Sequence, residues 1–175
     1  MRRMQVKVIL KKYRLEDQED VRELCNGVDR SYISNRLPLP YTKEDAIWWI
    51  NMANEHDGKS GIFRLITVDD KIVGNISVEQ KSDVFGQDAE IGYLLSTENQ
   101  SKGIATEAVK QICRIAFSEL NIIRITGLVY EPNIASKRVL EKNNFALEGV
   151  MQNAVVKDHN VYNLCVYGLL KGAEA

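Results

Sequence analysis

The sequence predicts an α+β fold with one mixed, mostly antiparallel sheet of about seven strands flanked by helices. Runs of β-branched and aromatic residues follow one another closely between residues 62 and 95, as in a strand meander. Over residues 104–120 the apolar spacing changes to nearly four, which indicates an amphipathic helix. Strand and helix patterns then alternate as far as residue 170.

Length and composition indicate a single globular domain over residues 1–175. Of the 175 residues, 45% are hydrophobic and 27% are charged, and no repeat or Pro/Gly-rich linker divides them. A chain of this size buries about 70% of its unfolded surface, so it needs no metal or disulfide to form a core. The net charge of −1 gives no strong attraction to nucleic acid or to a membrane.

The first half of the chain begins with a predicted strand at residues 6–13 and a helix at 16–25. Residues 35–41 contain two prolines and are expected to form an extended loop. Thr42, with Asp45 three residues later, is typical of a helix start, and this helix is expected to reach about residue 55.

The second half is predicted to contain most of the sheet. Asp69 and Asp70 indicate a hairpin turn between its first two strands. The predicted strands are 62–68, 71–78, 89–95, 124–130, 146–152 and 161–170, and the helices are 104–120 and 135–142. Because a long helix separates strands 89–95 and 124–130, these two are expected to be parallel.

The cysteines and histidines do not indicate a metal site. Cys25, Cys113 and Cys165 are odd in number and lack C-x-x-C spacing, so reduced thiols in a cytoplasmic protein are expected. His56 and His159 have no ligand-spaced partners. No apolar segment resembles a signal peptide or reaches the roughly 18 residues of a membrane span.

The segment that follows residues 89–95 has features of an anion-binding loop. It reads Gln-Ser-Lys-Gly-Ile-Ala over residues 100–105, just where the long helix begins. Amide groups at a helix N-terminus can bind phosphate oxygens, Gly103 permits close approach, and Lys102 adds positive charge. An ordinary strand–loop–helix connection is the alternative. The segment is neither a P-loop nor a dinucleotide-binding fingerprint.

This segment also resembles the Q/R-x-x-G-x-G/A signature of the GNAT superfamily of acetyl-CoA-dependent N-acetyltransferases. Four further blocks are similar to its RimJ/RimL-type branch, in the same order and at similar spacing. These blocks are residues 40–42 with the Trp-bearing helix, 89–94 with 103–108, 133–141, and 145–149. The resemblance covers nearly the whole chain and implies the GNAT fold.

The resemblance implies a site for acetyl-CoA between the strands at 89–95 and 124–130, which splay apart in this family. Tyr93, Leu94 and Leu95 are then expected to offer main-chain contacts to the pantetheine arm. The expected pyrophosphate site is Ser101, Lys102, Gly103, Ile104, Ala105 and Thr106. Asn133 and Ser136 are expected near the thioester. From the residues alone, a helix cap at Asn133 and a first-turn position at Ser136 remain the alternatives.

The implied reaction is direct transfer of an acetyl group to a primary amine, either a protein N-terminus or a small amine. A backbone N–H at Leu95 or its neighbour is the expected oxyanion donor. Glu90 is the expected base, with a solvated strand residue as the alternative, and Glu131 is a weaker candidate. The resemblance implies a catalytic role for Ser136, at the position of the serine that RimL-type members pair with a glutamate, and leaves the general acid open. Two family positions differ: a common tyrosine is Leu140, and a RimL-type glutamate is Val155.

Tyr41, Trp48 and Glu131 are the candidates for binding the acceptor, although aromatic residues on a short helix also commonly fill a core. The two differing positions keep a second class open, a non-catalytic acyl-CoA-binding module with the same fold. No metal is expected, and either a monomer or a homodimer is compatible with the sequence.

Overall fold

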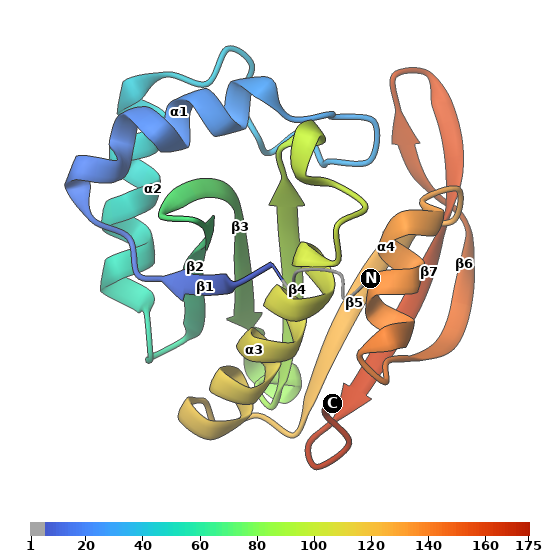
Figure 1. The fold of residues 1–175 in the computed structure, drawn as a ribbon. Helices are drawn as coiled ribbons and strands as arrows, with labels where there is room; N and C mark the ends of the chain where they lie inside the picture. The colour runs from blue at the N-terminus through green and yellow to red at the C-terminus, as the bar shows by residue number, and fades with distance from the viewer. Residues whose placement is uncertain (1–5) are drawn as a thin grey trace, which may run out of the picture.

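A computed structural model describes residues 6–175 and contains a seven-stranded sheet with the strand order β1-β2-β3-β4-β5-β7-β6. Only β4 and β5 are parallel neighbours. The predicted mixed, mostly antiparallel sheet is therefore confirmed (Figure 1). The strands are β1 (Val8–Lys11), β2 (Gly61–Val68), β3 (Lys71–Gln80), β4 (Asp88–Leu95), β5 (Arg124–Tyr130), β6 (Ala146–Lys157) and β7 (Asn160–Leu170).

Within residues 6–175, four helices cover the sheet. They are α1 (Gln18–Gly27), α2 (Lys43–His56), α3 (Ile104–Glu119) and α4 (Ile134–Lys142), with short 3₁₀ turns at Leu15–Asp17, Asp83–Phe85 and Thr97–Asn99. Helices α3 and α4 pack on one face, and α1 and α2 pack on the other face over β2 and β3 (Figure 1). The second face of β4 and β5 is therefore left without a covering helix.

The core divides into two clusters, one under each pair of helices. The larger lies between the sheet and α3, where Ile104, Ala108, Ile112 and Ala116 are all buried, as the apolar spacing predicted. The smaller lies beneath α1 and α2. The capping pair at the start of α2 is also present, because the Thr42 side chain accepts from the Asp45 N–H.

Several element boundaries differ from the prediction by one or two residues, and the end of strand β6 differs by five. Strand β1 covers only Val8–Lys11, because Tyr13 turns away and is buried in the cluster beneath α1 and α2. Strand β6 continues five residues beyond the predicted 152, with register shifts against β7. Its side chains are almost all exposed up to Val155, so apolar alternation gives little indication of where it ends.

Candidate active site

An opening separates β4 from β5. Their pairing joins Asp88–Ile91 to Arg124–Gly127 and stops there. Beyond that point, within residues 6–175, β4 continues along β3 only and β5 along β7 only. The facing edges of the two strands therefore leave backbone groups free to pair with an extended ligand.

Packing of α4 on β5 accompanies this separation. Leu140 of α4 is 1% exposed and lies directly over Gly127, where an added Cβ would come within 2.7 Å of the Leu140 Cδ1 atom. The position at which the resemblance implied a tyrosine is thus a packed core position in this chain. Leu140 contributes shape to the opening and no proton donor.

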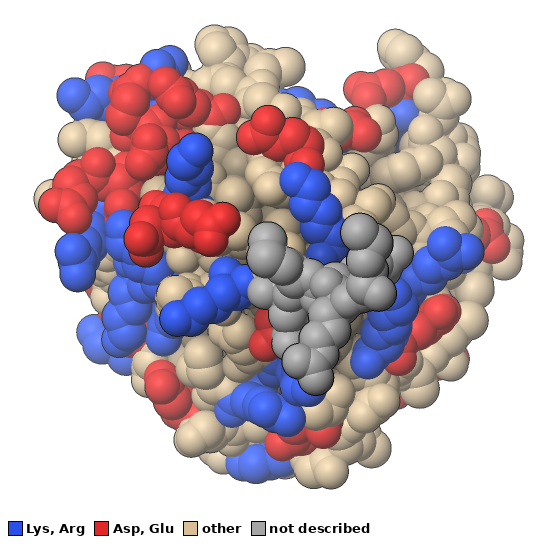
Figure 2. Space-filling model, in the orientation of Figure 1, with Lys and Arg blue, Asp and Glu red and all other residues tan. Residues whose placement is uncertain are grey.

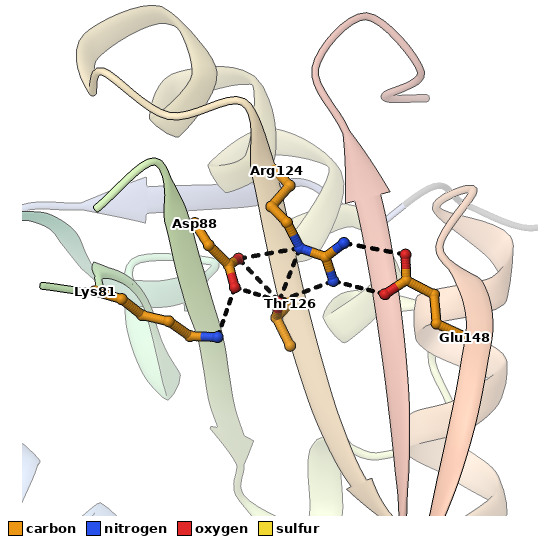
Figure 3. Close-up of polar contacts among 5 residues, drawn as sticks. All are labelled: Lys81, Asp88, Arg124, Thr126 and Glu148. Atoms are coloured by element: carbon orange, nitrogen blue, oxygen red, sulfur yellow. Dashed lines mark hydrogen bonds and ion pairs between the residues drawn. The ribbon is translucent and has the colours of Figure 1, made fainter. Parts of the chain in front are cut away.

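A polar network, the closed-end network, joins the strands where β4 and β5 are still paired (Figure 3). It consists of Lys81, Asp88, Arg124, Thr126 and Glu148. The Asp88 carboxylate accepts from Lys81 Nζ at 2.6 Å and from Thr126 Oγ1 at 2.8 Å. Arg124 donates to both Glu148 oxygens, at 3.1 and 2.6 Å, and this holds the pKa of Glu148 below its usual value. The network therefore joins the two strands at their paired end, away from the opening.

Backbone alternation decides which groups of β4 face the opening. The Ser96 N–H donates to the Val73 carbonyl of β3 at 2.8 Å. Because successive N–H groups of a strand point in opposite directions, the Leu94 N–H is directed toward β3, opposite Asn75. The N–H groups of Tyr93 and Leu95 are directed toward the opening. The main-chain groups available to a ligand are therefore those of Tyr93 and Leu95.

The N-terminus of α3 lies just beyond the end of β4. Its N-cap residue is Gly103, at φ 80°, which has no side chain to accept from the first-turn amides. Ser101 also has a positive φ, and residues 101–103 are exposed. Ile104 is buried, whereas Ala105 and Thr106 are half-buried. Residues 101–103 therefore form an exposed loop that leads into α3, whose first turn holds the other three predicted residues.

The N-terminus of α4 lies on the helical face of the opening. Asn133 is its N-cap, and the Asn133 Oδ1 atom accepts from the Ser136 N–H at 3.2 Å. The hydroxyl oxygens of Ser136 and Tyr93 lie 2.6 Å apart. Burial raises the pKa of Tyr93 to about 12, although the Ser136 contact acts in the opposite direction. The side chain of Tyr93 was not anticipated from the sequence.

Glu90 lies on the opposite, helix-free face of the sheet. It is exposed, and its register partners are Glu79 on β3 and Thr126 on β5. Within residues 6–175 its carboxylate has no hydrogen bond or ion pair. The next residue on this face is Gly92, where an added Cβ would meet no atom within 4 Å. The face of the sheet at Gly92, next to Glu90, is therefore not covered by other side chains.

An aromatic cluster borders this helix-free face. Tyr130 at the end of β5 lies 5.9 Å from Tyr32 and 5.6 Å from Tyr162 of β7, measured between ring centroids. Lys157 at the end of β6 donates to the carbonyls of Arg30 and Ile33. The loop of residues 28–42 is thereby joined to the β6–β7 hairpin. Sequence patterns could not predict these contacts, because they join residues about 100 positions apart.

The three predicted acceptor residues lie in different places. Tyr41 is buried in the cluster beneath α1 and α2. Trp48 is 66% exposed on α2, the helix that packs over β2. Glu131 follows β5 and accepts from the Asn163 Nδ2 atom at 2.7 Å. The structure thus brings only Glu131 to the end of the opened strands.

An acidic groove lies beside the end of β4. It is lined by Asp20, Glu23, Leu24, Gly27, Asp70, Lys71, Ile72, Ser96, Thr97 and Glu98. Four of these residues carry carboxylates and one carries an ammonium group. Acidic side chains also gather on the surface over α1 (Figure 2). The electrostatic field at this end of β4 therefore attracts cations.

The described residues hold no group of three or more His, Cys, Asp or Glu side chains arranged for a metal ion. All three cysteines are buried and unpaired, and burial raises the pKa of Cys25 to about 11 and that of Cys113 to about 12. None of the helices within residues 6–175 combines the length and apolar character that a membrane crossing requires.

An opened parallel strand pair beside a glycine-capped helix is the architecture of an acyl-CoA-dependent transferase. The family model described as "Acetyltransferase (GNAT) domain" matches residues 7–146. The chain belongs to this GNAT acetyltransferase family, which uses acetyl-CoA as the acetyl donor and no metal.

Two relatives come from Bacillus subtilis (strain 168). The probable N-acetyltransferase YjcK is 41% identical over 98 residues, which cover 53% of this chain and 54% of YjcK. The uncharacterized N-acetyltransferase YnaD is 26% identical over 167 residues, 94% of each chain. The chain thus aligns with about half the length of YjcK and nearly all of YnaD.

A solved structure of RimL, the ribosomal L7/L12 alpha-N-protein acetyltransferase, in complex with coenzyme A has the same fold. It superposes with a TM-score of 0.83 at 18% identity, covering 95% of both chains. The acetyltransferase MccE, solved with acetyl-CoA and AMP, has a TM-score of 0.79 at 22% identity, covering 94% of this chain and 92% of MccE.

Proposed function

We propose that this protein transfers the acetyl group of acetyl-CoA directly to a primary amine in a ternary complex. The observation that carries the proposal is the opening between β4 and β5, with the Tyr93 and Leu95 N–H groups directed into it. A pantetheine arm contains amide groups that can pair with such an edge. The outward amides of residues 101–106 suit its diphosphate.

The two faces of the sheet have separate chemical roles in this proposal. The amine approaches on the helix-free face, where Glu90 takes its proton through water. The sulfur departs on the helical face, where the Ser136 hydroxyl can donate a hydrogen bond to it. The carbonyl carbon lies in the opening between these groups, so attack and departure occur on opposite sides.

The register favours the Tyr93 N–H over the Leu95 N–H as the oxyanion donor. At about 3.3 Å per residue, Leu95 lies roughly 17 Å from Glu90 along the strand, whereas Tyr93 lies about 10 Å away. Tyr93 also contacts Ser136, the proposed donor to sulfur. We therefore assign the oxyanion to Tyr93 and the pantetheine contact to Leu95. Loss of one such donor typically costs about 3 kcal/mol of transition-state stabilisation.

The properties of the thiols support direct transfer over an acetyl-cysteine intermediate. A cysteine nucleophile reacts as the thiolate. Cys25 and Cys113 are buried, and burial raises their pKa values to about 11 and about 12. Neither is a thiolate near neutral pH.

A peptide N-terminal amine is the acceptor we favour. RimL is an alpha-N-protein acetyltransferase. A second acetyltransferase of similar structure, from Salmonella typhimurium, modifies the N-terminal serine of the 50S ribosomal subunit protein L7/L12. The loop of residues 28–42 and the β6–β7 hairpin flank the helix-free face, as the walls of a peptide site would. Small amines are the second acceptor class.

The test is release of free CoA thiol from acetyl-CoA with a panel of N-terminal peptides, polyamines and amino acids. We expect turnover with at least one acceptor, and a fall of roughly 100-fold in kcat for Glu90→Gln. Glu79→Gln is the matched control, because it removes the neighbouring carboxylate of the same sheet face. Equal losses in the two variants would exclude a specific role for Glu90.

A non-catalytic acyl-CoA-binding module is the second candidate. It is favoured by Leu140, which is packed over Gly127, and by Val155 of β6, which pairs with Tyr162 of β7, because neither Leu140 nor Val155 can donate a proton. Binding of acetyl-CoA with no turnover across the whole acceptor panel would support this module and overturn the transferase.

A further inference from the structure

The Tyr93–Ser136 contact joins the two sides of the opening. Tyr93 belongs to the part of β4 that has separated from β5, and Ser136 belongs to the first turn of α4, which follows β5. Their hydroxyl oxygens are 2.6 Å apart, and Tyr93 Oη also lies 3.4 Å from the Ser136 carbonyl oxygen. The pair therefore lies across the cleft, on the face where the sulfur departs.

The direction of this hydrogen bond follows from the chemistry of the two hydroxyls. A phenolic O–H is the stronger donor and an aliphatic hydroxyl oxygen the better acceptor, so Tyr93 donates to Ser136. The phenol stays protonated, because burial raises the pKa of Tyr93 to about 12, and Cys113 of α3, the titratable group facing it, is also neutral. The Ser136 hydrogen is then left free to point elsewhere.

We propose that Tyr93 is a positioning residue that directs the Ser136 hydroxyl hydrogen at the departing sulfur of CoA. This inference rests on the proposed acetyl transfer and deepens it. It explains how the site stabilises a thiolate although Leu140 stands at the position of the family's common tyrosine. The donor is Ser136, whose hydroxyl oxygen already accepts a hydrogen bond from the buried Tyr93 hydroxyl.

The step balances without a further reactant. As the tetrahedral intermediate collapses, the C–S bond breaks and its electron pair stays on sulfur. The Ser136 O–H donates a hydrogen bond to the thiolate, and no proton leaves Tyr93. The amine proton goes to water through Glu90, and the thiolate takes a proton from water when CoA is released.

The experiment measures the pKa of the CoA thiol while CoA is bound, so it does not depend on knowing the acceptor. Ultraviolet absorbance of the thiolate is titrated from about pH 6 to about pH 10, with complexes of dethio-CoA as blanks to subtract tyrosine ionisation. Calorimetry gives the Kd for CoA. The variants are Tyr93→Phe, Ser136→Ala, their double variant, and Ser136→Thr, which keeps the hydroxyl.

Tyr167→Phe is the matched control. Tyr167 is also buried, and its hydroxyl also contacts α4, but through Glu141 at 3.0 Å and not through Ser136. This variant removes one tyrosine hydroxyl from the same core without touching the pair. A general effect of loosening α4 would appear here as well.

We expect Ser136→Ala to lower the thiolate-to-thiol ratio of bound CoA about tenfold and Tyr93→Phe about threefold. The double variant should match Ser136→Ala, whereas Ser136→Thr and Tyr167→Phe should match the unmodified protein. If Tyr93→Phe does not fold, an unchanged thiol pKa in Ser136→Ala overturns the proposal, because the hydroxyl that Tyr93 is proposed to position would then have no effect on the sulfur.

An unchanged thiol pKa in Tyr93→Phe, or additive effects in the double variant, would overturn the inference while acetyl transfer stands. Failure of the unmodified protein to bind CoA would instead remove the proposed function, and the inference with it. The two failures are therefore distinguishable.

Discussion

At the scale of single residues, the site depends on positions where a side chain is small or already engaged. Gly92 leaves the helix-free face open above β4, and Leu140 fills the space over Gly127. Asn133 uses one amide oxygen to cap α4 and keeps its Nδ2 group available. These details separate positions that hold the fold from positions that meet a substrate.

Gly92→Val should block the acceptor while sparing the donor. Its side chain would occupy the open face beside Glu90, where no atom lies within 4 Å of the added Cβ, so the fold should tolerate it. We expect the KM for the acceptor to rise at least tenfold and the Kd for CoA to change less than twofold. Calorimetry and steady-state kinetics measure the two quantities, and a weakened Kd would contradict this separation of faces.

A pair of Asn133 variants separates the cap from the cofactor contact. Asn133→Ala loses the cap to the Ser136 N–H and should lower the free energy of unfolding by about 1 kcal/mol. Asn133→Asp keeps the capping oxygen and loses the amide donor. Denaturant unfolding measures the loss of stability, and calorimetry measures the Kd for CoA. Weaker CoA binding in both variants supports a contact between Asn133 and the pantetheine arm. Unchanged CoA binding in both variants shows that Asn133 acts only as the cap of α4.

At the scale of elements, the end of α2 is tied to β2 by a buried ion pair. Asp57 follows α2 and pairs with Arg64 of β2, and both side chains are at most 10% exposed. Burial acts to raise the pKa of Asp57, but donation from the Phe63 N–H, Arg64 and Lys12 outweighs it and holds the pKa below its usual value. The carboxylate is therefore charged in the folded state.

This lowered pKa predicts a loss of stability in acid. The stabilisation from Asp57 is fully present above its unfolded pKa of about 4 and is lost as the pH falls through the lower folded value. Asp57→Asn should lower the free energy of unfolding by about 3 kcal/mol at neutral pH, since it leaves Arg64 buried without its charge partner. It should also make the free energy of unfolding depend less on pH in the acid range. Urea unfolding at several pH values measures both effects, and an unchanged pH dependence in the acid range would contradict the assignment.

A comparison of predicted and observed elements shows which features of the structure the sequence predicts. Helix α3 and strand β5 agree closely with their predicted bounds, and the buried residues of α3 recur on one face as predicted. The pattern at residues 100–105 located the exposed loop and the start of α3, since both depend on local turn and helix-start residues. The Tyr93–Ser136 pair and the Tyr32 cluster depend on packing between distant segments, which periodicity does not encode.

At the scale of the whole molecule, charge is balanced in total but unevenly distributed. The net charge is −1, yet the groove beside the end of β4 is lined by Asp20, Glu23, Asp70 and Glu98 against Lys71. An amine acceptor reaches the protein as a cation. The long-range field therefore favours its approach at the same end of the molecule as the cofactor opening.

Ionic strength should consequently weaken acceptor binding. Raising salt from about 0.05 to about 0.5 M shortens the screening length from roughly 14 to roughly 4 Å, so the KM for a cationic acceptor should rise about threefold or more. The double variant Asp20→Asn/Glu23→Gln should reduce that dependence and leave kcat unchanged. Steady-state kinetics at several salt concentrations measure it, and a salt-independent KM would show that this groove does not attract the acceptor.

The closed-end network also has a consequence for molecular recognition. Its five side chains hold the paired ends of β4 and β5 together through contacts within this protein alone (Figure 3). The opening beyond the paired ends is likewise already present, so a thioester need not separate the two strands in order to bind. A preformed receptacle spends little of the cofactor's interaction energy on reorganisation. The loops that border the acceptor face can therefore differ between relatives, and so suit different amines, while the site for acetyl-CoA stays the same.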